Sequence, residues 1–338
     1  MGLTRTALAV DAGNSKTDVA LVAADGRLLG TARGGGFQPP LVGATRAVDV
    51  LAPLVASALA QAGRPTVTGP VDHLSAFLAN ADLPVEETAL TAEIARRGWS
   101  HTVSVRNDTF ALLRAGLPDF GEPVGVAVVC GAGINCAGLG HHGATARFPS
   151  IGRISGDWGG GSFLADEALW HAARAEDGRG AATELAHALP AHFGLTTMPE
   201  LIEALHLRDI PDRRRHELAP VLFAVAASGD RVARGIITRQ AEEVVLMATV
   251  ALRRLDLLAE PVPVVLGGSV LAARHPLLHD RVLHLLSERA PKAVPHVVTA
   301  PPVLGAALDT LDRADAEADA YGRLRTAWKE RGLGAGST

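Results

Sequence analysis

Asp11 is the first residue whose place in the sequence suggests chemistry. It ends the apolar run Ala7–Asp11, and a turn of small residues with one lysine follows. The turn comprises Gly13, Asn14, Ser15, Lys16 and Thr17. Its backbone N–H groups could form an anion-binding nest for a phosphate, and the carboxylate beside them could hold Mg²⁺ directly or through water. An ordinary hairpin turn without a ligand accounts for the same residues equally well.

Asp108 is a second carboxylate beside the end of a predicted strand. Asn107 and Asp108 follow the strand Thr102–Arg106 and open a helix. Asn and Asp are preferred at helix N-termini, so capping alone explains the pair. A carboxylate at such a junction that faces a ligand could also accept a proton from a substrate hydroxyl, as a general base.

Three glycine-rich segments lie beyond residue 130. They are Gly131, Ala132 and Gly133 with Asn135; Gly156–Ser162, which contains Asp157; and Gly267, Gly268 and Ser269. The first is a turn with room for a phosphate, but it is not a Walker A loop, because no Gly-Lys-Ser/Thr follows. The second is either a flexible linker or a backbone packed close to a ligand. The third is either a tight strand-to-helix turn or a surface on which adenosine lies.

The cysteines and histidines exclude two kinds of site. Cys130 and Cys136 are the only cysteines, too few for a disulfide framework in a chain of this length. The spacing of cysteines and histidines does not assemble a zinc site.

The first 120 residues are predicted to follow the order βββαβαβα. The predicted strands are Ala7–Asp11, Thr17–Val22, Leu28–Ala32, Val71–Leu78 and Thr102–Arg106, and the predicted helices are Val42–Ala62, Val85–Arg97 and Asp108–Ala115. This order places Asp11 at a strand end and Asp108 just beyond one.

The second half repeats the pattern without repeating the sequence. The predicted strands are Val124–Cys130, Asn135–Leu139, Ala144–Phe148, Val262–Leu266 and His296–Thr299. Helices are predicted over Phe163–Leu258, broken by prolines at 190, 199, 211 and 220, and then over Pro276–Arg289, Val303–Leu311 and Ala314–Arg331. We therefore predict two lobes, 1–120 and 121–312, with the last helix packing back on the first lobe.

The composition excludes several classes of protein. The chain has 338 residues, 48% of them hydrophobic and 20% charged, with a formal net charge of −4 and no concentrated basic face for nucleic acid. No apolar run approaches the ~18 residues of a membrane span, and Asp11 interrupts the apolar stretch that a signal peptide would need. We expect a cytoplasmic protein. The 32 basic residues include only three lysines, which is typical of a GC-rich bacterial genome.

Taken in order, these motifs resemble the BadF/BadG/BcrA/BcrD ATPase family, and within it the N-acetylglucosamine kinase-like branch of the actin/hexokinase/Hsp70 superfamily. The resemblance covers nearly all of the chain. It implies an α/β, two-lobed actin-like ATPase (ribonuclease H-like) fold with duplicated domains and a cleft between them. It also implies an ATP- and Mg²⁺-dependent kinase that phosphorylates a hydroxyl of a small amino sugar.

The resemblance also assigns roles by position. Asp11 would bind the metal, and Asp108 would be the general base. The residues that would bind phosphates or nucleotide are Gly13–Thr17, Gly131–Gly133 and Gly267–Ser269. Those that would line the sugar pocket are Gln38, Asn107, Asn135 and Asp157.

Two departures from the family's pattern affect the sugar pocket. Trp158 stands where the family's Gly-Asp-Glu-Gly-Ser motif has glutamate, and Gln38 stands where an asparagine contacts the sugar. N-acetylglucosamine, glucosamine, N-acetylmannosamine, a muramic acid derivative or another hexose therefore stay open as acceptors.

Three other functions compete with the kinase. One is an activator with an Fe–S cluster shared between subunits, and another is an ATP-driven switch, filament or chaperone that has no acceptor. A sugar-responsive transcription regulator would need an N-terminal helix-turn-helix, where this sequence predicts a strand. The apolar run Val244–Met247 either packs in a core or forms a dimer seam, and relatives in the family lead us to expect a homodimer.

Overall fold

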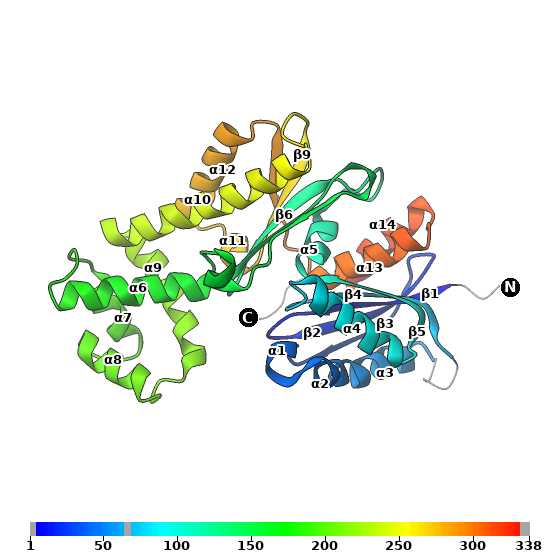
Figure 1. The fold of residues 1–338 in the computed structure, drawn as a ribbon, viewed down its shortest axis with the longest axis horizontal. Helices are drawn as coiled ribbons and strands as arrows, with labels where there is room; N and C mark the ends of the chain where they lie inside the picture. The colour runs from blue at the N-terminus through cyan, green and yellow to red at the C-terminus, as the bar shows by residue number, and fades with distance from the viewer. Residues whose placement is uncertain (1–4, 64–68, 332–338) are drawn as a thin grey trace. The chain divides into compact units, whose positions relative to one another are not determined.

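The computed structural model describes residues 5–63 and 69–331, which form two compact units (Figure 1). The first contains the described residues up to 127, residues 137–149, and those from 298 onward; the second contains residues 128–136 and 150–297. The predicted lobes, 1–120 and 121–312, place the helix at 302–313 in the second lobe, whereas in the structure this helix packs against strands of the first unit.

The first unit is built on a five-stranded mixed sheet in the order β3-β2-β1-β4-β5. Its strands are β1 (Thr6–Ala12), β2 (Thr17–Ala23), β3 (Leu28–Gly34), β4 (Val71–Leu78) and β5 (Ser100–Asn107). The β1–β2 and β2–β3 pairs are antiparallel, whereas the β1–β4 and β4–β5 pairs are parallel. Parallel neighbours end at the same edge, so the ends of β1, β4 and β5 come together there.

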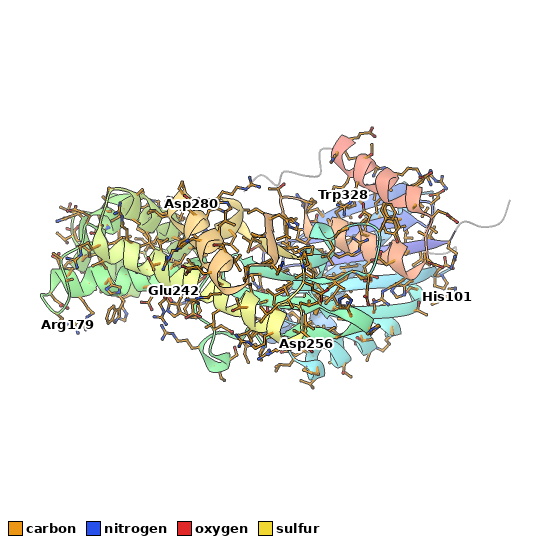
Figure 2. The ribbon with its side chains drawn as sticks, turned by 90° about the horizontal axis from the view of Figure 1, so that it is seen from above. His101, Arg179, Glu242, Asp256, Asp280 and Trp328 are labelled. Atoms are coloured by element: carbon orange, nitrogen blue, oxygen red, sulfur yellow. The ribbon has the colours of Figure 1, made fainter. Side chains whose placement is uncertain are left out.

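Helices cover this sheet, whose strands β1 and β2 are buried along their whole length. The helices of the first unit are α1 (Pro39–Val42), α2 (Ala44–Asp49), α3 (Leu51–Gln61), α4 (Pro84–Arg96), α5 (Thr109–Gly116), α13 (Pro302–Arg313) and α14 (Ala318–Glu330). Helices α2, α3 and α4 share an apolar core with β1 and β4, while α13 packs on β1, β2 and β4 together with α5 (Figure 1). A Cβ on Gly305 would lie 1.8 Å from the Ala111 carbonyl oxygen, so glycine permits the close approach of α13 and α5. Trp328 of α14 is buried (Figure 2).

A second five-stranded sheet has the order β10-β9-β6-β7-β8. Its strands are β6 (Gly125–Cys130), β7 (Ile134–Leu139), β8 (Thr145–Arg147), β9 (Val262–Gly267) and β10 (Ala293–Val297). The β7–β8 pair is antiparallel and the β9–β10 pair is parallel. Counted along the chain, the strands take the same spatial order as in the first sheet, which confirms the predicted repeat and the actin-like α/β fold class.

The second unit also carries most of the long helices. They are α6 (Gly161–Glu176), α7 (Leu185–His192), α8 (Met198–His206), α9 (Leu218–Ala227), α10 (Arg231–Arg254), α11 (Ser269–Ala272) and α12 (Pro276–Arg289), with short 3₁₀ turns at Gly152–Ser155 and Asp212–Glu217. On α10, Val244, Val245 and Met247 are buried, whereas Leu246 is half exposed. Most of this apolar run therefore packs in the core of its own unit, and the homodimer stays a prediction.

The structure corrects several predicted boundaries. The single helix over 42–62 is three helices that begin at Pro39, separated at Gly43, whose φ is +81°, and at Val50. Of the four prolines expected to break helices, only Pro211 lies between two helical elements. Prolines 199 and 220 lie in the first turns of α8 and α9, where no N–H partner is needed, and proline 190 lies near the end of α7.

The C-terminal elements also shift relative to the prediction. The strand expected at 296–299 is β10 at 293–297, and α13 extends to Arg313. The last helix begins at Ala318, four residues later than predicted, because Asp315 adopts a left-handed φ of +50° that interrupts the helical path.

Candidate active site

Asp11 lies near the carboxyl end of β1 in a crowded acidic environment. Its side chain is buried, and β1–β2 pairing places it opposite Asp18. Burial raises the pKa of Asp11 well above its ordinary value; nearby Asp108 and Asp18 raise it further, and Lys16 lowers it. Asp18 itself is paired with Arg33, with 2.6 Å between the carboxylate oxygen and Nε. Asp11 is thus the carboxylate that lacks a full counter-charge.

These surroundings fit a divalent cation whose other ligands come from a substrate. Among the described residues, no group of three His, Cys, Asp or Glu side chains could hold a metal by itself. Mg²⁺ usually takes only one or two carboxylates, with waters and phosphate oxygens completing its shell. A cation beside Asp11 would offset the repulsion from Asp108 and Asp18. The buried Thr17 hydroxyl, for which the structure provides no hydrogen-bond partner, adds an unused oxygen close by in sequence.

The turn after β1 is a tight hairpin supported by a second loop. Gly13 donates its N–H to the Lys16 carbonyl over 2.8 Å, and Phe37 donates its N–H to the Gly13 carbonyl over 2.9 Å. The Gln38 amide donates to the Asn14 carbonyl over 3.2 Å. The structure thus brings Gln38, a predicted sugar-pocket residue, against the predicted phosphate turn.

Asp108 lies in a turn that the Asn107 side chain orders. Asp108 precedes α5 but makes no side-chain cap; instead the Asn107 side-chain oxygen accepts a hydrogen bond from the Thr109 N–H over 2.9 Å. The Asn107 amide group donates to Asp82 over 2.8 Å. The capping explanation therefore applies to Asn107, which is buried and whose side chain makes the cap hydrogen bond.

The protonation of Asp108 suits a general base. Burial raises its pKa to about 6, although N–H groups of Thr109 and of Asp108 itself partly oppose this. A base with a pKa near the working pH is ionised at neutrality and still takes up a proton readily. Asp108 also lies close enough to Asp11 to raise the pKa of that carboxyl.

Two residues after β4 join this group and were missed by the sequence analysis. Asn80 has a left-handed φ of +61°, and its amide donates to the Asn14 side chain over 2.9 Å and to the Phe37 carbonyl over 3.2 Å. Asp82 contacts Asn107, as described above. The available signal was their position: β4 runs parallel between β1 and β5, so polar residues just past its end should meet those past its neighbours.

The Gly131–Gly133 turn lies in the second unit and packs on the glycine run before α6. Gly161 donates its N–H to the Gly131 carbonyl over 2.7 Å, and Ser162 donates to Ala132 over 3.0 Å. A Cβ on Gly160 would lie 2.4 Å from the Gly133 backbone, whereas a Cβ on Gly131 or Gly133 would enter open space. The turn therefore has room on its outer side for a ligand.

Gly268 has a structural role at the end of β9. Its φ is +81°, and a Cβ there would lie 2.5 Å from the Cys130 backbone. The glycine pair of Gly267 and Gly268 therefore marks a strand-to-helix turn packed on β6. This contact places Gly267–Ser269 near the start of the Gly131–Gly133 turn.

Asn135 and Asp157, the other predicted sugar-pocket residues, both order local backbone in the second unit. The Asn135 side-chain oxygen accepts hydrogen bonds from the Cys136 N–H over 2.7 Å and from the Ser150 hydroxyl over 2.5 Å. Asp157 accepts from the Gly152 N–H over 3.1 Å and from the Ser155 hydroxyl. Both side chains thus fix the segment between β8 and α6.

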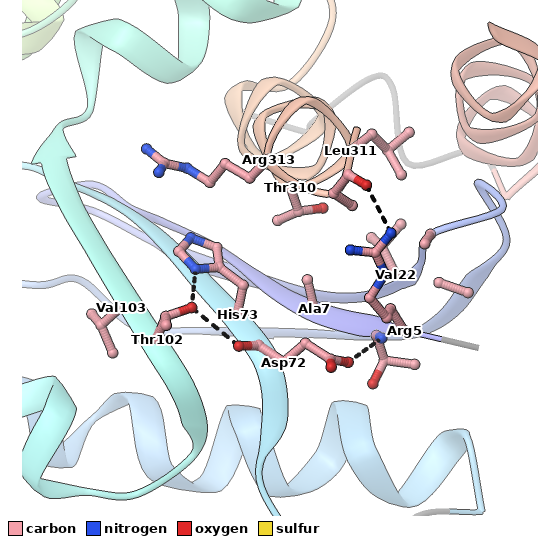
Figure 3. A pocket seen from close by; sticks show the side chains of 14 residues that line it. Arg5, Ala7, Val22, Asp72, His73, Thr102, Val103, Thr310, Leu311 and Arg313 are labelled. Atoms are coloured by element: carbon pink, nitrogen blue, oxygen red, sulfur yellow. Dashed lines mark hydrogen bonds between the residues drawn. The ribbon is translucent and has the colours of Figure 1, made fainter. Parts of the chain in front are cut away.

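A large cavity in the first unit lies away from these residues (Figure 3). It measures about 570 Å³ and is lined by Arg5, Asp72, His73 and Thr102. These residues lie at the beginnings of β1, β4 and β5, the opposite end of the sheet from Asp11. None of the predicted site residues lines this cavity.

The two cysteines are inert in this fold. Cys130 and Cys136 are fully buried, and burial raises the pKa of the Cys130 thiol to about 12 and that of Cys136 strongly as well. The Cys136 thiol faces the Met247 carbonyl at 3.7 Å.

No helix within 5–63 and 69–331 combines the length and apolar character needed to cross a bilayer.

The chain is similar to known proteins over most of its length. Residues 8–309 match the BadF/BadG/BcrA/BcrD ATPase family. The N-acetyl-D-glucosamine kinase of Dictyostelium discoideum is 28% identical over 218 residues, covering 64% of this chain and 67% of the relative. The N-acetylmuramic acid/N-acetylglucosamine kinase of Clostridium acetobutylicum is 25% identical over 214 residues, covering 63% and 69%.

A solved structure supports the fold. The crystal structure of a Chromobacterium violaceum protein assigned as an N-acetylglucosamine kinase has a TM-score of 0.68 to this chain at 23% identity. The match covers 91% of this chain and 99% of that one. At this level of identity, the likeness establishes the shared architecture.

Proposed function

The chain belongs to the BadF/BadG/BcrA/BcrD ATPase family, and we propose that it is an ATP-dependent sugar kinase. In this proposal the γ-phosphoryl group of Mg-ATP is transferred to a hydroxyl of an amino sugar, N-acetylglucosamine or a related hexosamine. Two relatives named as amino-sugar kinases support the acceptor class. The observation that carries the proposal is Asp108, a carboxylate whose pKa is raised by burial to about 6 and which lies close to Asp11.

Asp108 would act on the acceptor hydroxyl. Its ionised carboxylate accepts the hydroxyl proton as the oxygen attacks the γ-phosphorus, and the bond from that phosphorus to the leaving ADP oxygen breaks. The cap hydrogen bond to the Thr109 N–H is made by the Asn107 side chain, so Asp108 is not required for that cap. A protein that only hydrolyses ATP has no need of such a base for an acceptor alcohol, so Asp108 favours a kinase.

The turns after β1 and β6 would bind the phosphates. The Gly13–Thr17 turn and the open outer side of the Gly131–Gly133 turn offer backbone N–H groups for anionic oxygens. Asp11 would hold Mg²⁺, which when bound supplies positive charge to the transferring phosphoryl group. Gly267–Ser269 would lie at the adenosine.

The sugar would contact Gln38, Asn107, Asn135 and Asp157. Gln38 is longer than the asparagine expected from the family and is held at the Asn14 carbonyl. Trp158 is 6% exposed and packs under Arg239, so it does not reproduce the acidic side chain of the family motif. Because both changes fall in the predicted sugar pocket, the acceptor is proposed as a class, the hexosamines.

The burial of the cysteines argues against the Fe–S activator. Bridging a cluster between subunits requires accessible thiolates, and both thiols are fully buried with raised pKa values. The second candidate is therefore the ATP switch of the same fold. Such a switch would bind ATP with the same phosphate turns as the kinase, but it would have no sugar as an acceptor.

ADP release from Mg-ATP, measured with a panel of sugars, tests the proposal. The panel contains N-acetylglucosamine, N-acetylmannosamine, glucosamine, glucose and a control without sugar. Strong stimulation by one hexosamine would support the kinase and identify its acceptor. An equal rate with and without every sugar would favour the ATP switch.

A further inference from the structure

A basic pocket in the second unit has no role in the proposed phosphoryl transfer. It lies between α6, the turn that follows α6, and the first turns of α10, with a volume of about 420 Å³. Small-molecule sites commonly measure about 300–1,000 Å³. The lining residues that matter here are Trp158, Trp170, Arg174, Arg179, Arg231 and Arg239. Arg179 lies in the turn beyond the end of α6 (Figure 2).

The pocket holds more positive than negative charge. Arg179 is paired with Asp177 at 2.5 Å, and Arg239 approaches Glu243 at 3.9 Å. Arg174 and Arg231 form no ion pair with any residue in the described ranges 5–63 and 69–331. Arg174 nevertheless lies close enough to Asp177 to lower the pKa of that carboxyl, and Glu167 also lines the pocket. The lining thus has four arginines and one carboxylate, and its charge is positive.

Arg231 is the first residue of α10, a helix of 24 residues. The N-terminus of this helix is already capped, because the Asp230 carboxylate accepts a hydrogen bond from the Ala233 N–H over 2.8 Å. Arg231 therefore contributes to the site through its place on the pocket wall, and the helix terminus adds no further anion site.

Two tryptophans hold arginines on the walls of the pocket. The Arg239 guanidinium carbon lies 4.1 Å from the ring centroid of Trp158, and that of Arg174 lies 4.6 Å from the ring centroid of Trp170. Arg174 also donates one N–H to the Arg179 carbonyl oxygen over 2.9 Å, so its other N–H groups and those of Arg239 are the donors for a planar or tetrahedral anion. Stacking also restricts the side chains before a ligand arrives, which lowers the entropic cost of binding.

We propose that this basic pocket is a second ligand site, separate from the phosphoryl-transfer site, for a small phosphate or phosphate monoester. Trp158 belongs to the Gly156–Ser162 segment, and Arg239 adjoins Gln240, whose side-chain oxygen accepts the Gly160 N–H over 2.9 Å. Arg239 and Trp158 on the pocket wall are therefore each adjacent in sequence to a residue or segment joined by this hydrogen bond. Binding requires no kinase activity, so a binding experiment tests this second site whether or not the protein is a sugar kinase.

The test titrates the full-length protein, without ATP, with inorganic phosphate and separately with glucose 6-phosphate. Intrinsic tryptophan fluorescence and calorimetry both report binding. The phosphate oxygens are the shared chemistry, and the tighter of the two probes identifies free phosphate or a phosphate ester as the source. Arg231→Gln should weaken binding at least about tenfold, because it removes a charged hydrogen bond.

A matched control distinguishes this pocket from general basic surface and from the active site. Arg213 is an exposed arginine of the same unit outside the pocket, and Arg213→Gln should leave both affinities unchanged. Arg239→Gln, on the opposite wall, should weaken binding as Arg231→Gln does. Equal affinity in wild type and Arg231→Gln would place any phosphate elsewhere and overturn the proposal, as would no saturable binding of either probe.

Discussion

Replacing Asp108 with asparagine should make the protein more stable and far less active. Burial raises the pKa of this carboxyl from 3.8 to about 6. That difference of about 2 corresponds to about 3 kcal/mol, at about 1.4 kcal/mol per pKa unit. Because the side chain is only partly buried, solvent screening reduces the effect, and we expect a gain of about 1–2 kcal/mol in the free energy of unfolding at pH 8.

The sign of this effect depends on pH. Above pH 6, Asp108 is ionised in both the folded and the unfolded protein, and the folded state carries the full cost of a desolvated charge. Below about pH 4 the carboxyl is protonated in both states and the cost disappears. Wild-type stability therefore falls as the pH rises from about 4 to 6 through this group, and Asp108→Asn removes that loss.

Urea unfolding of wild type and Asp108→Asn at pH 8 and pH 4 measures this difference. Asp209→Asn, which changes an exposed aspartate, serves as the control and should have no effect at either pH. An advantage for Asp108→Asn that is equally large at pH 4, or absent at pH 8, would refute the reasoning about its burial.

The same variant should lose phosphoryl transfer by at least ~10²-fold while still binding ATP. For the wild type, kcat/KM should fall about tenfold for each pH unit below 6, as the base becomes protonated. Near-normal turnover by Asp108→Asn would remove Asp108 from the catalytic role.

Three further predictions concern the second unit. Gly268→Ala should destabilise the protein by more than about 1 kcal/mol relative to Gly178→Ala in thermal unfolding, because both glycines have a φ of +81° but only Gly268 meets backbone atoms; equal effects would contradict the packing argument. Gln240→Leu should cost about 1–3 kcal/mol in urea unfolding, because it leaves a buried N–H of the glycine segment without its acceptor. Cys130 and Cys136 should react with a thiol reagent at pH 8 only after unfolding, and rapid labelling of the native protein would contradict their burial.

The strands and the polar residues at their ends were predictable from the sequence. Alternating and apolar runs located β1, β2 and β4 closely, and the carboxylate at the end of β1 followed directly from the local pattern. Such features depend on a few neighbouring residues. The same holds for Asp108, whose position between a strand and a helix is visible in sequence.

Contacts between distant segments were not predictable. Asn80 and Asn14 are 66 residues apart in the sequence and are joined by a hydrogen bond, but the residues around each do not indicate this contact. For the glycine runs that contain Gly160 and Gly268, the sequence left a close ligand as one of two explanations, and in the structure each of these glycines packs against the backbone of another segment. Local sequence shows that a glycine is needed but does not show what approaches it.

Transfer of the label from [γ-³²P]ATP to N-acetylglucosamine tests the central claim most directly. We expect the label to appear in a sugar phosphate with the wild type, and this transfer to fall at least ~10²-fold with Asp108→Asn. If the related hexosamines of the panel are the acceptors, the label appears in their phosphates instead. Label found only in inorganic phosphate, with every sugar present in turn, would contradict the kinase and identify an ATPase.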